Sequence, residues 1–174
     1  MSGSSVRPSG VAPSADEPSG KVRHGTAMPA ITPFVPDDDA ACRRLAARAA
    51  LSSYGPPLPH ARARFAEDHP LDPAELRLVA RMDSRIAGFL ELNGSHIDNL
   101  LVDPAFQGRG IGTSLLRHVM VGATSDLTLS VFTVNPAARR LYERHGFAVE
   151  ELRTIDFAGG KADVWRMRWR RQPR

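Results

Sequence analysis

Residues 107–112 read Gln-Gly-Arg-Gly-Ile-Gly and lie between an apolar run that ends at Val102 and an amphipathic segment that continues to about Val121. Glycines between a strand and a helix leave backbone N–H groups free to point at an anion, and the helix dipole adds to the attraction. The segment lacks the Gly-Lys-Ser/Thr of a Walker loop, and its glycine spacing is not the G-x-G-x-x-G of a dinucleotide fold. By itself this loop indicates either an anion site or a plain turn.

The chain on both sides of the loop alternates between strand-like and helix-like segments. Apolar runs bounded by turn residues predict strands, and apolar positions at helical spacing behind a capping residue predict helices. The predicted strands are Ala30–Val35, Glu75–Met82, Arg85–Leu92, His96–Val102, Leu127–Val131, Phe147–Asp156 and Ala162–Trp169. The predicted helices are Asp37–Leu51, a short one over His60–Asp68, one from the glycine loop to Val121, and Asn135–His145, with an irregular loop over Ser52–Pro59. This order predicts one mixed α/β domain in which meander strands flank a central β–α–β passage.

The positive charge of the chain is concentrated at its end. The formal net charge is +4, yet residues 166–174 hold five arginines and no acid, so the body of the chain is slightly acidic. In the last predicted strand Trp165, Met167 and Trp169 alternate with arginines, a pattern typical of a half-buried strand with a solvated arginine face. Because a nucleic-acid binder carries basic charge on its folded face, we expect no nucleic-acid partner.

Several classes of protein are excluded or disfavoured by composition. Residues 1–27 are rich in Ser, Gly and Pro and lack large apolar residues, which predicts a disordered leader before a folded domain over 28–170 and a tail over 171–174. No apolar run suits a membrane span or a secretory signal, so we expect no membrane partner and a cytoplasmic location. The single cysteine, Cys42, is expected to be a small buried residue, and the histidines show no paired ligand spacing, so we expect no metal.

Two motifs in order give the chain a family resemblance. The segment Ile97–Leu116 resembles motif A of the GNAT N-acetyltransferase superfamily, whose Gln/Arg-x-x-Gly-x-Gly/Ala core is met by Gln107, Gly110 and Gly112. The segment Asn135–Phe147 is similar to the N-x-x-A-x-x-x-Y-x-x-x-G-F pattern of the same family. The resemblance covers roughly residues 29–170. It implies the GNAT acyltransferase fold, a central twisted, mostly antiparallel sheet with a β–α–β acetyl-CoA-binding core, and acetyl-CoA as co-substrate.

The resemblance also implies roles for individual residues. The backbone of Leu100, Leu101 and Val102 would line the pantetheine arm, and one N–H there would polarise the thioester carbonyl. Asn135 would hydrogen-bond the same arm, and Tyr142 would protonate the departing thiolate as general acid, although a packed helix aromatic is the simpler role for it. The pyrophosphate would be held by the loop and first helical turn, comprising Gln107, Gly108, Arg109, Gly110, Ile111, Gly112 and Thr113. For the Arg109 side chain, a phosphate contact and a solvated surface charge both remain open.

Transfer to an amine also needs a proton acceptor. A primary amine with a pKa near 10.4 is neutral in only about one molecule in 10³ to 10⁴ at pH 7, a handicap of roughly 4.6 kcal/mol. Asp98, on the strand that leads into the loop, is the first candidate base and shares a strand face with His96; Glu91 and a water wire are the alternatives. Ser95, His96 and Asp98 are not a hydrolase triad, because neighbours on one strand cannot form the relay.

The leading hypothesis is an N-acetyltransferase that acetylates a primary amine of a small-molecule or amino-acid-like acceptor by direct attack in a ternary complex. The acceptor pocket would be built from Tyr54–His60 and Asp156–Asp163. Acetylation of protein lysines or N-termini, or of aminoacyl-tRNA, is the alternative, as is a non-catalytic acyl-CoA-binding module. Ser130 stands where the branch that acetylates ribosomal-protein N-termini has a Glu, which weakens that alternative. Family members often form dimers, so a homodimer remains open.

Overall fold

The computed structural model describes residues 28–54, 58 and 64–172; the predicted leader over 1–27 therefore lies outside the described residues. The described helices are α1 (Asp39–Tyr54), α3 (Ile111–Gly122) and α4 (Pro136–Arg144), with 3-10 turns at Pro36–Asp38 and Pro104–Phe106. The described strands are β1 (Ala30–Pro33), β2 (Leu76–Met82), β3 (Arg85–Asn93), β4 (His96–Val102), β5 (Leu127–Phe132), β6 (Ala148–Phe157) and β7 (Gly160–Trp169).

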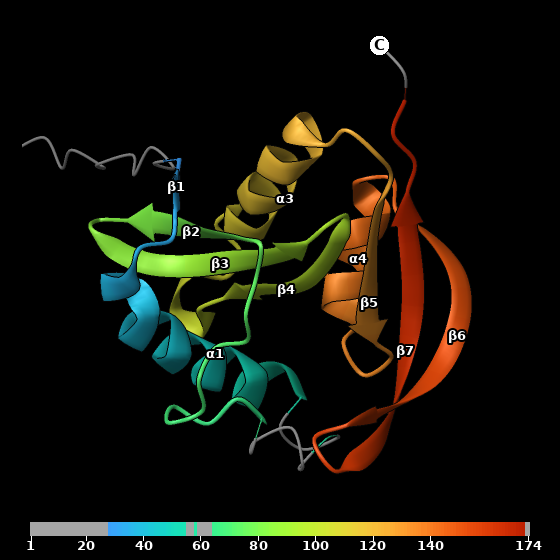
Figure 1. The fold of residues 1–174 in the computed structure, drawn as a ribbon, viewed down its shortest axis with the longest axis horizontal. Helices are drawn as coiled ribbons and strands as arrows, with labels where there is room; N and C mark the ends of the chain where they lie inside the picture. The colour runs from blue at the N-terminus through green and yellow to red at the C-terminus, as the bar shows by residue number, and fades with distance from the viewer. Residues whose placement is uncertain (1–27, 55–57, 59–63, 173–174) are drawn as a thin grey trace, which may run out of the picture.

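The strands form one sheet in the order β1-β2-β3-β4-β5-β7-β6 (Figure 1). All neighbouring pairs are antiparallel except β4 and β5, which are parallel and joined through α3. This confirms the predicted mixed α/β fold with a mostly antiparallel sheet and one β–α–β passage.

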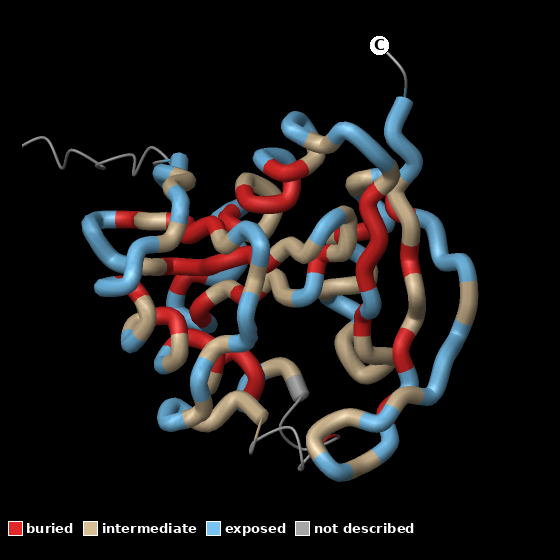
Figure 2. Tube along the Cα trace, viewed as in Figure 1, coloured by how far each residue is buried: buried red, intermediate tan, exposed pale blue. Residues whose placement is uncertain are grey.

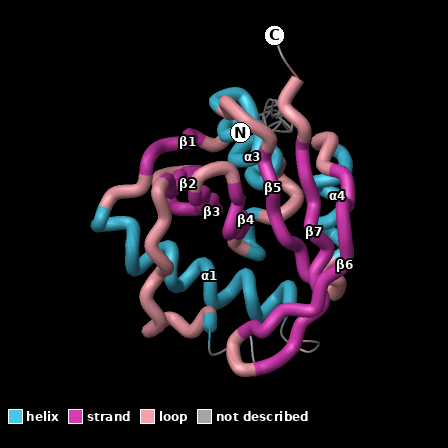
Figure 3. Tube along the Cα trace, turned by 45° about the vertical axis from the view of Figure 1, so that its right-hand side comes forward, coloured by secondary structure: helices cyan, strands magenta, loops and turns pink. Residues whose placement is uncertain are grey.

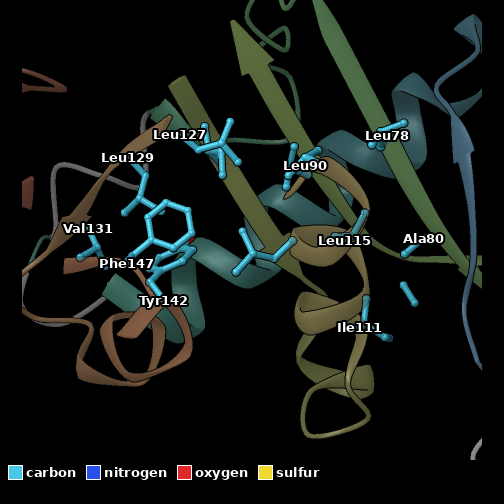
Figure 4. Packing of buried hydrophobic residues seen from close by; sticks show 14 of the residues in the cluster. Leu78, Ala80, Leu90, Ile111, Leu115, Leu127, Leu129, Val131, Tyr142 and Phe147 are labelled. Atoms are coloured by element: carbon cyan, nitrogen blue, oxygen red, sulfur yellow. The ribbon is translucent and has the colours of Figure 1, made fainter. Parts of the chain in front are cut away.

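Helices cover both faces of the sheet. Helix α1 packs on one face through a cluster that joins Cys42, Leu45 and Ala46 to Phe89 of β3 and Leu101 of β4. Cys42 is fully buried, as predicted. Helices α3 and α4 pack on the other face, where the larger cluster includes residues from most of the strands (Figure 4). The view in Figure 3 shows α1 lying apart from α3 and α4.

Strand β7 buries different faces at its two ends. Met167 is buried in the large cluster and Trp165 and Trp169 pack against it, so the predicted apolar face is confirmed. On the arginine face, Arg168 donates to Glu150 at 2.5 Å in an exposed ion pair. At the hairpin end the opposite face is buried instead, through Ala162 and Val164, whereas β6 is largely exposed (Figure 2).

Two sequence predictions near the end of α1 need correction. The loop predicted over Ser52–Pro59 is wrong at its start, because α1 continues to Tyr54. Serine costs a helix only a few tenths of a kcal/mol relative to good helix formers, so the helix runs on until Gly55 and Pro56, which are stronger breakers. Of the helix predicted over His60–Asp68, residues 60–63 lie outside the described part; Arg64 is helical as predicted, but the chain from Phe65 to Asp68 forms turns.

Candidate active site

Strands β4 and β5 are paired at one end only. His96 faces Thr128 and Ile97 faces Leu129, and within the described residues the pairing stops there although β4 continues to Val102. On its other edge β4 stays paired with β3 along its length. The backbone of Leu100, Leu101 and Val102 therefore has one edge in the sheet and one edge facing the gap where β5 has turned away.

A β-bulge at Asp98 coincides with the start of this divergence. Asn99 pairs with Glu91 and Ile97 with Leu92 on β3, so Asp98 is an extra residue without a partner on that strand. A bulge reverses the faces that the residues beyond it occupy. Accordingly Ile97 lies in the cluster under α3 whereas Leu101, four residues on, lies in the cluster under α1.

The glycine loop lies directly beyond the open edge of β4. Gly108 and Gly110 have φ angles of 75° and 78°, a left-handed conformation that side chains rarely adopt, and Gly110 is the residue before the first turn of α3. The N–H groups of Ile111, Gly112 and Thr113 have no acceptor earlier in their own helix. A Cβ on Gly112 would lie 3.2 Å from Leu141, so this glycine also lets α3 approach α4.

The side chains of the other predicted loop residues, Gln107 and Arg109, make different contacts. The Gln107 amide donates to the Val102 carbonyl at 3.3 Å and so ties the loop to the end of β4. The Arg109 guanidinium lies 5.4 Å from the centre of the Phe106 ring. Loop residues 107 to 110 are exposed, which keeps their backbone accessible to a ligand.

Asn135 precedes α4 as its capping residue, and Tyr142 lies on this helix. The Asn135 side chain accepts the Ala138 N–H at 3.1 Å and caps the helix. Tyr142 is buried beside Phe147, with ring centres 5.8 Å apart, in the cluster that contains Leu129 and Val131 of β5 (Figure 4). The structure thus places Tyr142 against the strand that borders the gap, in a position compatible with both its predicted role and simple packing.

Polar groups surround the point where the strands part. His96 Nδ1 lies 2.9 Å from Thr128 Oγ1, and His96 Nε2 lies 3.9 Å from the Asp98 carboxylate, so the prediction that His96 and Asp98 share a face is confirmed. The Asn93 amide donates to Asp98. Burial lowers the pKa of His96, Arg166 adds to this effect and Asp98 opposes it, so the imidazole is neutral at pH 7. Thr128 and Asn93 belong to neighbouring strands, and no sequence signal marked them.

Glu91 has a different environment from Asp98. It is 2% exposed, accepts from Arg77 at 2.6 Å and accepts from the Asn99 amide at 2.6 Å. It borders a pocket of about 20 Å³, which has room for about one water molecule. Both carboxylate oxygens are thus engaged by side chains of the two flanking strands, β2 and β4.

The predicted acceptor segments are only partly described. Of Tyr54–His60, most residues lie outside the described part. Leu58 is buried in a small cluster with Ala162 of β7, against which Phe132, Ile155 and Phe157 pack. The hairpin end of β6 and β7 therefore lies against Leu58.

The described residues show neither a grouping of metal ligands nor a membrane-spanning helix. No three or more His, Cys, Asp and Glu side chains are grouped so that they could hold a metal ion in that part of the chain. None of the helices described is long and apolar enough to cross a membrane.

Comparison with known proteins identifies relatives of this arrangement. The peptidyl-lysine N-acetyltransferase YjaB of Salmonella typhimurium is 38% identical over 72 residues, which are 41% of this chain and 49% of that protein. The N-alpha-acetyltransferase RimI of Mycobacterium tuberculosis is 44% identical over 68 residues, 38% of this chain and 43% of that protein. The chain thus spans about half the length of these curated relatives.

Solved structures share the fold over a longer stretch. The PaiA N-acetyltransferase of Thermoplasma acidophilum, crystallised in complex with coenzyme A, superposes with a TM-score of 0.64 at 18% identity and covers 82% of this chain and 98% of that one. The sequence profile described as acetyltransferase (GNAT) family matches residues 41–147, more than half of the chain. The resemblance seen in the two sequence motifs is confirmed: the chain belongs to the GNAT acetyltransferase family.

Proposed function

We propose that the chain is an acetyl-CoA-dependent N-acetyltransferase that acts on a primary amine by direct attack in a ternary complex. The observation that carries the proposal is the open edge of β4, which runs into a glycine loop at the N-terminus of α3. The pantetheine arm contains amides, which can pair with an open strand edge as an added strand does. A pyrophosphate suits the free N–H groups of a helix N-terminus. The residues present therefore fit acetyl-CoA.

Most of the predicted residues have a role in this proposal. The amides of Gly108 to Thr113 hold the pyrophosphate, and the backbone of Leu100 to Val102 holds the arm and polarises the thioester carbonyl. The side-chain oxygen of Asn135 caps α4, so the side-chain amide nitrogen is the group that donates to the arm. Bound acetyl-CoA supplies an activated thioester.

Two residues handle the protons. Asp98 lies at the bulge, where the strands part, and accepts the proton of the attacking amine directly or through water. Tyr142, beside β5, gives a proton to the sulfur as the carbon–sulfur bond breaks and the carbon–nitrogen bond forms. Glu91 remains the alternative base, but Arg77 and Asn99 already occupy both of its oxygens, which favours Asp98.

The acceptor in this proposal is the amine of a small or amino-acid-like molecule. A protein lysine or N-terminus is the second candidate, because YjaB and RimI carry the names of protein acetyltransferases. A screen of small amines, amino-acid amides and lysine peptides, read out as released thiol, separates the two.

The test of the cofactor site is calorimetric titration with acetyl-CoA. Gly110→Ala introduces only the strain of a side chain at φ 78°, whereas Gly110→Glu adds a carboxylate where the pyrophosphate would lie. We expect micromolar binding by the unmodified protein, a modest loss in Gly110→Ala and no measurable binding in Gly110→Glu. Failure of the unmodified protein to bind acetyl-CoA would overturn the proposal, and equal binding by all three proteins would remove the loop from it.

A further inference from the structure

Apolar side chains gather on the sheet face opposite α3 and α4, next to the gap between β4 and β5. Phe132 pairs with Val164 of β7, and Ile155 of β6 pairs with Ala162 of β7. Paired residues lie on the same face, and successive residues of a strand lie on opposite faces. Since Val131 packs under α4, Phe132 and its partners lie on the other side, together with Leu58 in the third cluster.

Three phenylalanines make the surface of this region aromatic. The rings of Phe132 and Phe157 are 4.9 Å apart at 63°, in an edge-to-face arrangement, and Phe65 lies 6.2 Å from Phe157. All three are partly rather than fully buried. We call Phe65, Phe132 and Phe157 the aromatic wall.

Strand β5 connects the aromatic wall to the polar groups of the proposed active site. Thr128, Ser130 and Phe132 share one face of this strand, at steps of about 7 Å. Thr128 faces His96, where β4 and β5 are still paired, and Phe132 ends the strand where they have parted. Asp98 lies on β4 across the gap, with an exposed carboxylate that attracts an ammonium group.

The polar groups at one end of this face and the aromatic wall at the other limit which chemical group the acceptor can carry next to its amine. A charged or strongly polar group would lose its hydration against the aromatic wall without gaining a hydrogen bond, whereas an apolar group would be stabilised there. We propose, on the basis of the proposed function, that the preferred acceptor is an α-amine with a bulky apolar side chain, as in a free or N-terminal hydrophobic amino acid. Its amine lies near Asp98 and its side chain lies against Phe132 and Phe157.

The test compares amides that differ in the side chain beside the amine. Phenylalaninamide, glycinamide and aspartic acid α-amide present the same α-amine, and Nα-acetyllysinamide presents only an ε-amine. We expect kcat/KM for phenylalaninamide to exceed that of each other probe by about tenfold or more, the discrimination that a hydrophobic pocket gives. Phe157→Ala should reduce this preference to about threefold or less.

Matched variants separate the aromatic wall from general effects. Leu152→Ala removes an exposed side chain from the same strand, β6, on its opposite face, and should keep the preference. Phe132→Leu keeps an apolar side chain at its position in the aromatic wall, so that loss of folding does not prevent the measurement. If the protein binds acetyl-CoA and acetylates the probes, but kcat/KM for phenylalaninamide is equal to or below that of the others, this inference alone is overturned. Transfer to none of the amides would also contradict the small-molecule acceptor of the proposed function. Absence of acetyl-CoA binding would overturn the proposed function and this inference together.

Discussion

Replacing Gly88 with alanine should destabilise the fold at the place where α3 lies closest to the sheet. A Cβ at this position of β3 would lie 2.9 Å from the Ile111 Cγ2 methyl and 2.9 Å from the Leu101 carbonyl oxygen. The methyl belongs to a buried residue, and the carbonyl belongs to β4, which is paired with β3 at this point. Neither atom can yield without moving α3 or the strand.

The size of the effect follows from this overlap. Overpacking a filled core costs about 1–3 kcal/mol, and a contact with backbone places Gly88→Ala at the upper end. Removing a glycine also lowers the entropy of the unfolded chain, which offsets about 0.4–1 kcal/mol. We therefore expect the free energy of unfolding to fall by about 2 kcal/mol. Because Ile111 is the first residue of α3, acetyl-CoA affinity should fall as well.

Urea unfolding followed by circular dichroism measures the change, with Gly122→Ala as the matched control. A Cβ on Gly122 meets nothing within 4 Å, so this variant should be unchanged or stabilised by up to about 1 kcal/mol. In an Ile111→Ala background the Gly88→Ala penalty should shrink, since one of the two close contacts is gone. If Gly88→Ala unfolds within about 0.5 kcal/mol of the unmodified protein, the packing argument is refuted.

Three further predictions concern single side chains. Tyr142→Phe should lower kcat about 10²-fold at saturating acetyl-CoA and leave the calorimetric Kd unchanged; a fall of less than about threefold would count against the general-acid role. Burial raises the pKa of the Asp103 carboxyl, but hydrogen bonds from Arg48 and the Ala105 N–H outweigh it and hold the pKa below its usual value. The stabilisation that the Asp103 carboxylate gives to the fold is therefore present at neutral pH and lost as pH falls below about 4. Arg48→Met should flatten that part of the acid unfolding curve by less than about 1 kcal/mol, because Arg48 is half exposed. Equal acid unfolding curves for the two proteins would contradict this prediction. Burial raises the pKa of Cys42 to about 12, so a chromogenic thiol reagent at pH 8 should modify the native protein at least about 10²-fold more slowly than the unfolded protein, and a comparable rate would disprove the burial.

Elements set by local chemistry were predictable from sequence. The predicted strands Glu75–Met82 and Arg85–Leu92 leave only Asp83 and Ser84 for the turn between them, and both residues have the positive φ angles, 49° and 62°, that two-residue hairpin turns require. Asn135 followed by Pro136 predicted the start of a helix, and the asparagine caps α4. Such signals act within a few residues, so they do not depend on what packs against them.

The bulge at Asp98 and the aromatic wall were not predictable in this way. The sequence over Ile97–Leu101 is compatible with a regular strand, and only the register against β3 shows the extra residue. Phe132 and Phe157 are 25 positions apart and meet only because β5 and β6 both pair with β7.

The sequence by itself determined the order of strands and helices, the glycine loop before α3, and membership of the family, because turn, cap and periodicity signals lie in consecutive residues. The tertiary structure alone decided that β4 and β5 part after two paired residues, that Glu91 is held by Arg77 and Asn99, and that the aromatic wall adjoins the gap. The physical reason is that register and cross-strand contacts depend on how distant segments bury their apolar surfaces together.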